Sequence, residues 1–381
     1  MEDTEQTINR DFSYSKLPEI SLSNNIKLLE INIENNEEKS FLPTKTSMEG
    51  EIETEDKKNN VESTIKPGKL WFSREFLVQF GIIYVASLLM FITGMHTGWV
   101  GPTILKLSSN NSEIPLTSTE VSWLAAMVPF GGGIGPTFGA ILANKIGRKN
   151  TILLTTVPEI FTWITVILAK DSYCLCIAQF IRGVTGGSAF AVIPMYVGEI
   201  SSPKFRGIMG TLSVLQHHAG LFFETALVPY ISISSNAGIA ITIPTFLILV
   251  FIWMPESPYY FLMKNQRENA GKSLRILSQN NKIEKQLDQL ERIVQEEQNE
   301  VQNFTEIFRV KNNRVSFILC LGIMSIQHLT GFVPLLVYAQ LILDKSNSPI
   351  DPYISGIIIQ GFGQQLQRNG RDKDGSYGTF A

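Results

Sequence analysis

The chain has 381 residues, of which 44% are hydrophobic and 18% are charged, so its length alone would allow one large soluble protein or two ordinary domains. The distribution of the hydrophobic residues excludes a soluble protein. The run 76–99 contains no Asp, Glu, Lys or Arg. At about 1.5 Å per residue, a helix of that length crosses the roughly 30 Å hydrocarbon core of a bilayer. The net charge of −3 indicates no particular partner, because overall charge does not steer a protein embedded in a bilayer.

Comparable apolar runs follow along the chain, and each is predicted to be a membrane-spanning helix. Together they predict an all-α membrane protein with seven spans and an N-terminal bundle of six closely spaced helices. The predicted spans are 76–99, 121–143, 151–169, 172–198, 207–229, 237–254 and 315–343.

The polar stretches divide the chain into five parts. An acidic tail rich in Asn, Ser and Thr, predicted to be disordered and cytoplasmic, precedes the six-span bundle. A polar loop follows the bundle, then the start of a second bundle, then a polar tail that no bilayer would accept. The predicted bounds are 1–70, 71–254, 255–314, 315–363 and 364–381.

The apolar run 354–363 is about half as long as a span requires. The sequence therefore predicts one full and one partial span of a second domain.

The polar loop 255–314 contains a stripe of apolar residues at helical spacing among Lys, Glu and Gln. The stripe predicts an amphipathic helix lying against the bundle, and a solvated linker helix is the alternative. Its residues are Ile283, Leu287, Leu290, Val294 and Val301.

Cationic residues predict the orientation, because short loops rich in Lys and Arg stay on the cytoplasmic side. Lys145, Arg148 and Lys149 lie between the second and third spans, and Lys204 and Arg206 between the fourth and fifth. These positions predict a multi-pass protein of the cell membrane with a cytoplasmic N-terminus. The glycosylation sequon at Asn110, predicted to lie outside, agrees with this orientation.

The loop between the second and third spans carries the strongest motif, in residues 139–149. Gly139 allows close helix packing, Gly147 allows a sharp turn, and the cations hold the loop at the membrane surface. The full spacing resembles the first signature of the major facilitator superfamily. Three further stretches, 180–207, 255–258 and 327–331, resemble motifs of that superfamily's sugar porters. Within the family, 98–102, 120–123 and 255–260 look most like insect facilitated trehalose transporters.

This resemblance implies facilitated diffusion of a hexose or trehalose by alternating access, in which two helical bundles rock about a central sugar site. The sequence contains no P-loop, no G-x-G-x-x-G and no cysteine pair with zinc spacing, so no enzyme activity, cofactor or metal is expected. The expected partners are a small sugar and the lipid bilayer, with no nucleic acid, and association with another transporter chain is an open alternative. The candidate sugar-binding residues are Gln327, Thr330, Gly331, His96 and Trp123.

A set of charged residues and glycines at the inner ends of the spans is expected to latch the two bundles in the outward-open state. The alternative is that these charges only fix the topology. Glu199 and Glu256 favour the latch, because they are acids at positions where a purely positive loop would serve topology better. The candidates are Gly139, Gly147, Arg148, Glu199, Arg206 and Glu256.

Several positions depart from the family pattern. Asn144 replaces an acid and Gln179 replaces an arginine, and one hypothesis is that both belong to a single latch network, in which a joint loss leaves no unpaired charge. His96 lies where proton-coupled sugar porters carry an acid, so it is either titratable or a simple hydrogen-bonding residue. Glu159, Arg182 and Glu224 are ionisable residues within apolar spans, and the sequence does not identify their partners.

Two other functions remain open. The chain could be a membrane protein that senses sugar, or binds a partner transporter, without moving substrate. It could also be an incomplete and inactive product of a transporter gene, because the motifs continue to Gly331 while the last spans of a second bundle are missing.

Overall fold

The computed structural model describes residues 73–108, 114–278, 283–299, 306–346 and 351–359. Within these ranges the regular structure is helical, with no strand. The predicted tails 1–70 and 364–381 and the sequon at Asn110 lie outside the described residues.

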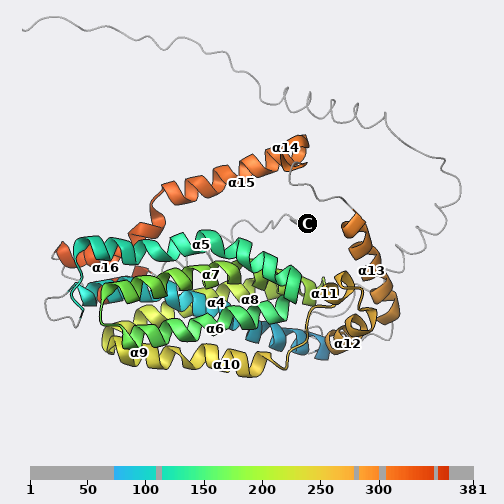
Figure 1. The fold of residues 1–381 in the computed structure, drawn as a ribbon, viewed down its shortest axis with the longest axis horizontal. Helices are drawn as coiled ribbons and strands as arrows, with labels where there is room; N and C mark the ends of the chain where they lie inside the picture. Colours follow the sequence, from blue (N-terminus) through green and yellow to red (C-terminus); the bar gives the residue numbers. More distant parts are fainter. Residues whose placement is uncertain (1–72, 109–113, 279–282, 300–305, 347–350, 360–381) are drawn as a thin grey trace, which may run out of the picture. The chain divides into compact units, whose positions relative to one another are not determined.

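Helices α4 to α10 run side by side as a bundle (Figure 1). α5 packs along α7, α4 packs along α8, and α6 contacts both α7 and α9. A short 3-10 turn, Val228–Tyr230, links α8 to α9. The helices are α4 (Arg74–Leu107), α5 (Ser118–Ile146), α6 (Arg148–Leu168), α7 (Ser172–Ile200), α8 (Arg206–Leu227), α9 (Ile233–Ala240) and α10 (Thr242–Phe251).

Five helices of the described part are long and apolar enough to cross a membrane: α4, α5, α6, α7 and the α9–α10 pair. The predicted span 207–229 forms α8, which is 22 residues long but is not among the five. Polar residues lower its hydropathy, and two of them, Gln216 and Glu224, are buried within the bundle. α8 therefore buries these polar groups against neighbouring helices, and a count of membrane spans based on hydropathy does not include it.

Glycine allows α5 and α7 to approach closely. A Cβ atom on Gly139 would lie 2.8 Å from the Cα of Ser188, which is closer than real Cβ contacts allow. Ser188 is fully buried, and its hydroxyl donates to the carbonyl of Gly135 on α5 at 2.8 Å. This contact sets the register of the two helices, and it accounts for Gly139 as a packing residue.

Three short helices follow the bundle: α11 (Pro258–Met263), α12 (Arg267–Leu277) and α13 (Ile283–Asn299). Leu287 and Val294 on one face of α13 pack with Leu262 and Ala270, and Leu290 borders this cluster. The apolar stripe of 283–294 is thus the buried face of a helix docked on α11 and α12. Val301 lies outside the described residues.

The predicted span 315–343 is not one helix. It forms α15 (Lys311–Leu329) and α16 (Phe332–Lys345), which follow the short α14 (Glu306–Arg309). Gly331 separates them with a φ of 69°, a left-handed conformation that glycine adopts without strain. Pro334 reinforces the break, because proline has no N–H to continue the hydrogen bonding of α15. α16 packs on α4, and residues 352–359 are also helical.

Candidate functional site

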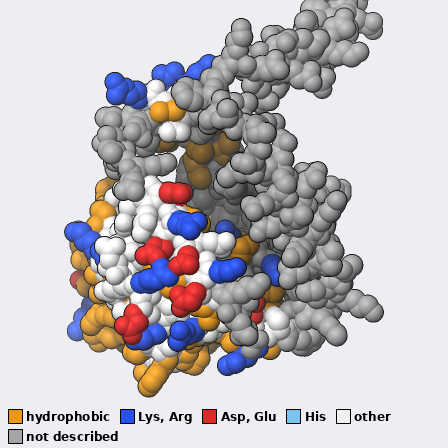
Figure 2. All heavy atoms as spheres, turned by 90° about the vertical axis from the view of Figure 1, so that its right-hand side faces the viewer, with side chains coloured by type: hydrophobic (Ala, Val, Ile, Leu, Met, Phe, Trp, Pro, Cys, Tyr) orange, Lys and Arg blue, Asp and Glu red, His pale blue; other side chains and the backbone are white. Residues whose placement is uncertain are grey.

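One end of the bundle, which we call the Arg148 end, collects charged side chains. It comprises the turn between α5 and α6, the last turn of α7, and the segment that leads from α10 into α11. Figure 2 views the molecule from the side on which α11 to α13 lie, and there Lys, Arg, Asp and Glu side chains gather, with hydrophobic side chains beside them.

Gly147 makes the turn that separates α5 from α6. Its φ of 97° and ψ of 163° are accessible to glycine but strained for any other residue. A Cβ atom at this position would lie 2.9 Å from the carboxyl carbon of Glu256 and 3.0 Å from Cε1 of Tyr260. Glycine is therefore needed here twice, for the backbone conformation and for the carboxylate that approaches it.

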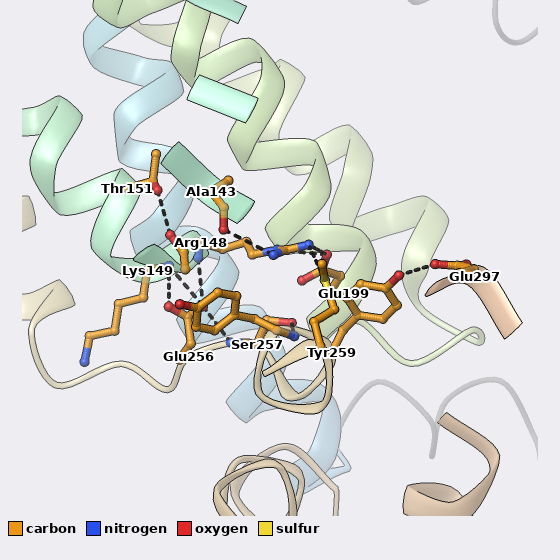
Figure 3. Close-up of polar contacts among 12 residues, drawn as sticks. Ala143, Arg148, Lys149, Thr151, Glu199, Glu256, Ser257, Tyr259 and Glu297 are labelled. Carbon is orange, nitrogen blue, oxygen red and sulfur yellow. Dashed lines mark hydrogen bonds and ion pairs between the residues drawn. The ribbon is translucent and has the colours of Figure 1, made fainter. Parts of the chain in front are cut away.

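The carboxylate of Glu256 caps the N-terminus of α6 (Figure 3). Its Oε1 accepts the backbone N–H groups of Arg148 at 3.0 Å and Lys149 at 3.1 Å, and also that of Ser257 at 2.9 Å. These N–H groups have no partner within the helix, and the positive end of the helix dipole favours an anion there. Glu256 thus ties the segment after α10 to the start of α6.

Arg148 is buried, with 2% of its surface exposed, and it contacts Glu199 on α7. Its Nε and Nη2 both donate to Oε1 of Glu199, at 3.0 Å and 2.8 Å. Its Nη1 donates to the carbonyl of Ala143 at the end of α5, at 3.2 Å. One guanidinium therefore joins three helices, α5, α6 and α7, at a single point.

Two tyrosines of α11 flank the Arg148 guanidinium. The Cζ of Arg148 lies 5.6 Å from the ring centre of Tyr259 and 5.7 Å from that of Tyr260, within the range of cation–π attraction. The Tyr260 hydroxyl donates to the carbonyl of Lys145 at 3.1 Å, and the Tyr259 hydroxyl donates to Glu297 on α13. The charged cluster is therefore connected through α11 to the peripheral helix α13.

The burial of this cluster alters its acid–base chemistry. Burial raises the pKa of Glu256 above its ordinary value of 4.5, although the N–H groups that it accepts act in the opposite direction. Burial also raises the pKa of Tyr259 to about 12, and the hydrogen bond to Glu297 adds to this effect. Tyr259 therefore remains a neutral hydrogen-bond donor at physiological pH.

The structure brings together four of the six predicted latch residues: Gly147, Arg148, Glu199 and Glu256. Gly139 lies instead in the contact of α5 with α7. Arg206 is exposed at the start of α8, and among the described residues its side chain forms no ion pair.

The hypothesis that Asn144 and Gln179 share one network is wrong. Asn144 lies at the Arg148 end, next to the carbonyl of Ala143 that Arg148 contacts. Gln179 accepts from Nη1 of Arg182 at 3.4 Å in the opposite half of α7. Along α7, Gln179 and Glu199 are about 30 Å apart at ~1.5 Å per residue.

The predicted sugar-binding residues are not gathered in one place by the described contacts. Thr330 and Gly331 lie at the break between α15 and α16, and the side chain of Gln327 is outside the described part. Trp123 on α5 is 58% exposed. His96 is 2% exposed, and its Nε2 lies 2.9 Å from Oε2 of Glu159 on α6.

Sequence reasoning did not find the partners of these residues. It singled out His96 and Glu159 separately, and no local pattern connects two positions on different helices. The tyrosines of α11 were noticed only as part of a motif, and the role of Glu297 in binding Tyr259 gave no signal in the sequence.

Comparison with known families decides the identity of this arrangement. The family model described as sugar (and other) transporter matches residues 82–362. The chain belongs to this family. It is accordingly a multi-pass membrane protein of the major facilitator superfamily, and the motif at the Arg148 end belongs to a sugar porter.

Among curated relatives, this family member is similar to insect facilitated trehalose transporters. It is 30% identical over 271 residues to the facilitated trehalose transporter Tret1 of Bombyx mori. The matched region is 70% of this chain and 52% of the relative. It is 28% identical over 282 residues to Tret1 of Apis mellifera ligustica, which covers 73% of this chain and 55% of the relative. The chain thus spans about half the length of the curated relatives that it matches.

Solved structures show the same fold. A partially occluded inward-open conformation of the xylose transporter XylE from E. coli superposes with a TM-score of 0.62 at 15% identity, covering 79% of this chain and 74% of XylE. XylE bound to 6-bromo-6-deoxy-D-glucose gives a TM-score of 0.59 at 17% identity, covering 74% of this chain and 67% of XylE. At these identities the likeness establishes the fold of the family member and not its substrate.

Proposed function

We propose that this chain moves a hexose or trehalose across the cell membrane by facilitated diffusion, through the alternating access of its family. The observation that carries the proposal is the buried Arg148–Glu199 pair with Glu256 at the start of α6. Burying charged side chains destabilises the protein unless each charge is paired. A paired network can therefore act as a switch between two discrete arrangements, one with the pairs formed and one with them broken.

In this proposal the Arg148 end is the cytoplasmic end and the cluster is a conformational latch. The cations of the two loops at this end support a cytoplasmic location, and the N-terminus would then also be cytoplasmic. The latch holds α5, α6 and α7 together through Arg148, and it reaches α13 through Tyr259. A change in access would break or rearrange the contacts of α11 with these helices.

We assign sugar contacts to Gln327, Thr330, Gly331 and Trp123. The break at Gly331 supports this assignment, because an interrupted helix exposes backbone groups that can hydrogen-bond a sugar hydroxyl. His96 is directed to Glu159 and is therefore a weaker candidate for a sugar contact.

Uptake of labelled glucose and trehalose by oocytes that express the full chain tests the proposal. We expect saturable uptake of at least one of these sugars. Glu199→Gln should reduce uptake about tenfold or more at equal surface expression, because it removes the charge that fixes Arg148. The matched control is Lys204→Ala, an exposed position in the α7–α8 loop, which should behave as the unmodified chain.

Two results would contradict transport. Absence of uptake at normal surface expression would reject it, and saturable sugar binding without uptake would indicate a sensor or a regulatory partner. Equal uptake by Glu199→Gln and the unmodified chain would retain transport and reject the latch.

A further inference from the structure

Gln79, near the start of α4, is a buried polar residue outside the set of latch residues. Its side chain is 1% exposed, and a buried amide destabilises a protein unless its polar atoms are hydrogen-bonded. Its Oε1 accepts the backbone N–H of Ser202, in the turn between α7 and α8, at 3.0 Å. Its Nε2 donates to the Ser202 hydroxyl at 2.8 Å and to the carbonyl of Leu277 at 3.1 Å. One amide therefore joins α4, the α7–α8 turn and the C-terminal end of α12.

The partners of the Gln79 amide fix its orientation. The backbone N–H of Ser202 can only donate, so it requires the amide oxygen. The Ser202 hydroxyl donates its proton to Glu75 at 2.5 Å, so it accepts from the amide nitrogen of Gln79. Leu277 ends α12, and the last carbonyls of a helix have no partner within that helix. Gln79 thus caps the C-terminal end of α12.

The buried face of α12 also reaches Glu256. Ala270, Ser273 and Leu277 are the buried residues of α12, and their spacing of three and four residues places them on one face of the helix. The Ser273 hydroxyl donates to the backbone carbonyl of Glu256. Leu277, which follows Ser273 by one turn, carries the carbonyl that Gln79 binds. α12 is therefore bound to α4 at its end and to the Glu256 backbone one turn earlier.

The backbone around Glu256 is held from α7 as well. The hydroxyl of the buried Tyr196 donates to the carbonyl of Pro255 at 2.7 Å. The successive carbonyls of Pro255 and Glu256 are thus bound by hydroxyls from two different helices, α7 and α12. The Glu256 carboxylate must meet the N–H groups of Arg148 and Lys149 at hydrogen-bond distance, and hydrogen bonds weaken steeply when their geometry is lost. Ser273 therefore helps to determine how well Glu256 caps α6.

We infer that Gln79 is a positioning residue, which sets the Glu256 carboxylate on the start of α6 by holding α12 in place. The contacts run from Gln79 to the Leu277 carbonyl, along one turn of α12 to Ser273, and from Ser273 to the Glu256 backbone. The effect on transport rests on the proposed function, in which Glu256 belongs to the latch. The positioning itself requires no sugar, because all of these contacts lie within the bundle and the helices docked on it.

Hydrogen exchange of the purified full chain, reconstituted in lipid nanodiscs without sugar, tests the positioning. We expect Gln79→Leu and Ser273→Ala each to speed the exchange of the backbone N–H groups of Arg148 and Lys149 about three- to tenfold, the effect of losing one hydrogen bond. The matched control is Lys272→Ala on the solvent face of α12, where the side chain is 64% exposed. This control should leave the exchange at the start of α6 unchanged.

A double variant separates an effect through α12 from a general loosening of the bundle. If Gln79 acts through Ser273, Gln79→Leu combined with Ser273→Ala should speed exchange at the start of α6 no more than Ser273→Ala alone. Effects of the two substitutions that multiply would overturn the inference. Faster exchange confined to α4 and α12, with the start of α6 unchanged, would overturn it as well.

A measurement on the unmodified chain does not depend on the folding of the variants. α12 and the start of α6 should open as one cooperative unit, so the exchange of both should show the same dependence on urea concentration. Different dependences would contradict the inference, because α12 could then open without releasing Glu256.

Uptake of labelled sugar by oocytes distinguishes a failure of this inference from a failure of the proposed function. Where the unmodified chain takes up sugar, Gln79→Leu should reduce uptake in the same direction as Glu199→Gln, at equal surface expression. Equal uptake by Gln79→Leu and the unmodified chain would reject the role of Gln79 in the latch. Absence of uptake by the unmodified chain would reject transport, and hydrogen exchange would still decide whether Gln79 positions Glu256.

Discussion

Arg148 on α6 places two of its nitrogen atoms, Nε and Nη2, on one carboxylate oxygen of Glu199 on α7, at 3.0 Å and 2.8 Å. The guanidinium is almost fully enclosed, whereas the Glu199 side chain remains 14% exposed. The arginine is thus the member of the pair that depends most on its partner. Its environment also includes the ring faces of Tyr259 and Tyr260.

Removing one member of this pair should destabilise the protein strongly. Arg148→Ala leaves Glu199 in a largely buried position without a cation, and we expect a loss of about 3–5 kcal/mol of stability. The double variant Arg148→Met with Glu199→Leu should recover most of this loss, because neither charge then remains unpaired. The thermal unfolding midpoint of the purified chain measures both. A double variant as unstable as Arg148→Ala would show that the packing of Arg148, and not its charge, stabilises the bundle.

The turn between α5 and α6 should not tolerate a side chain. Gly147→Ala strains a backbone with a φ of 97° and directs Cβ toward the Glu256 carboxyl group, so we expect a loss of about 1–3 kcal/mol. Gly210→Ala on α8 is the matched control, because a Cβ atom there meets nothing within 4 Å. That control should be neutral or should stabilise the helix by about 0.5–1 kcal/mol. Equal unfolding midpoints for the two variants would contradict the turn geometry.

The raised pKa of Glu256 predicts a pH dependence of stability. Between 4.5, the ordinary value, and the higher folded value, the folded protein retains a proton that the unfolded chain has released. Stability should therefore fall as the pH rises through this interval and become constant above the folded pKa. Glu256→Gln should show a smaller decrease than the unmodified chain, whereas Glu268→Gln, an exposed position on α12, should retain the full decrease. Thermal midpoints across a pH series provide the comparison, and identical slopes for Glu256→Gln and the unmodified chain would refute the prediction.

Docking of α13 should depend on its apolar face and little on its surface charges. Leu287 is 3% exposed and packs with Leu262 and Ala270, so Leu287→Ala should weaken this contact by about 2–5 kcal/mol. Arg267→Ala removes ion pairs to Asp288 and Glu291 near the surface, where solvent screens them, and should have little effect. Hydrogen exchange of the backbone of α13 distinguishes the two. Faster exchange in Arg267→Ala than in Leu287→Ala would reverse this ranking.

Much of the fold followed from local patterns. The hydropathy of each run predicted α4 to α7 because a helix that crosses a bilayer must carry about 20 apolar residues within one segment. The stripe with Leu287 and Val294 predicted the buried face of α13, because a period of 3.6 residues is visible in any window of the chain. One prediction failed where a single residue changed the outcome, because Gly331 interrupts the predicted span 315–343. The predicted span 207–229 is the helix α8, although its polar residues keep it out of a count based on hydropathy.

The sequence by itself determined the class of the protein, the approximate helix positions and the residue types of the charged motif. Only the tertiary structure decided which residues meet: Arg148 with Glu199, Glu256 with the start of α6, and His96 with Glu159. The physical reason is that helical periodicity is a local property, visible in a short segment. The rotation and register of one helix against another depend on close contacts such as that of Gly139 with Ser188. Such a contact is made by residues that are far apart in the sequence, so no short segment contains it.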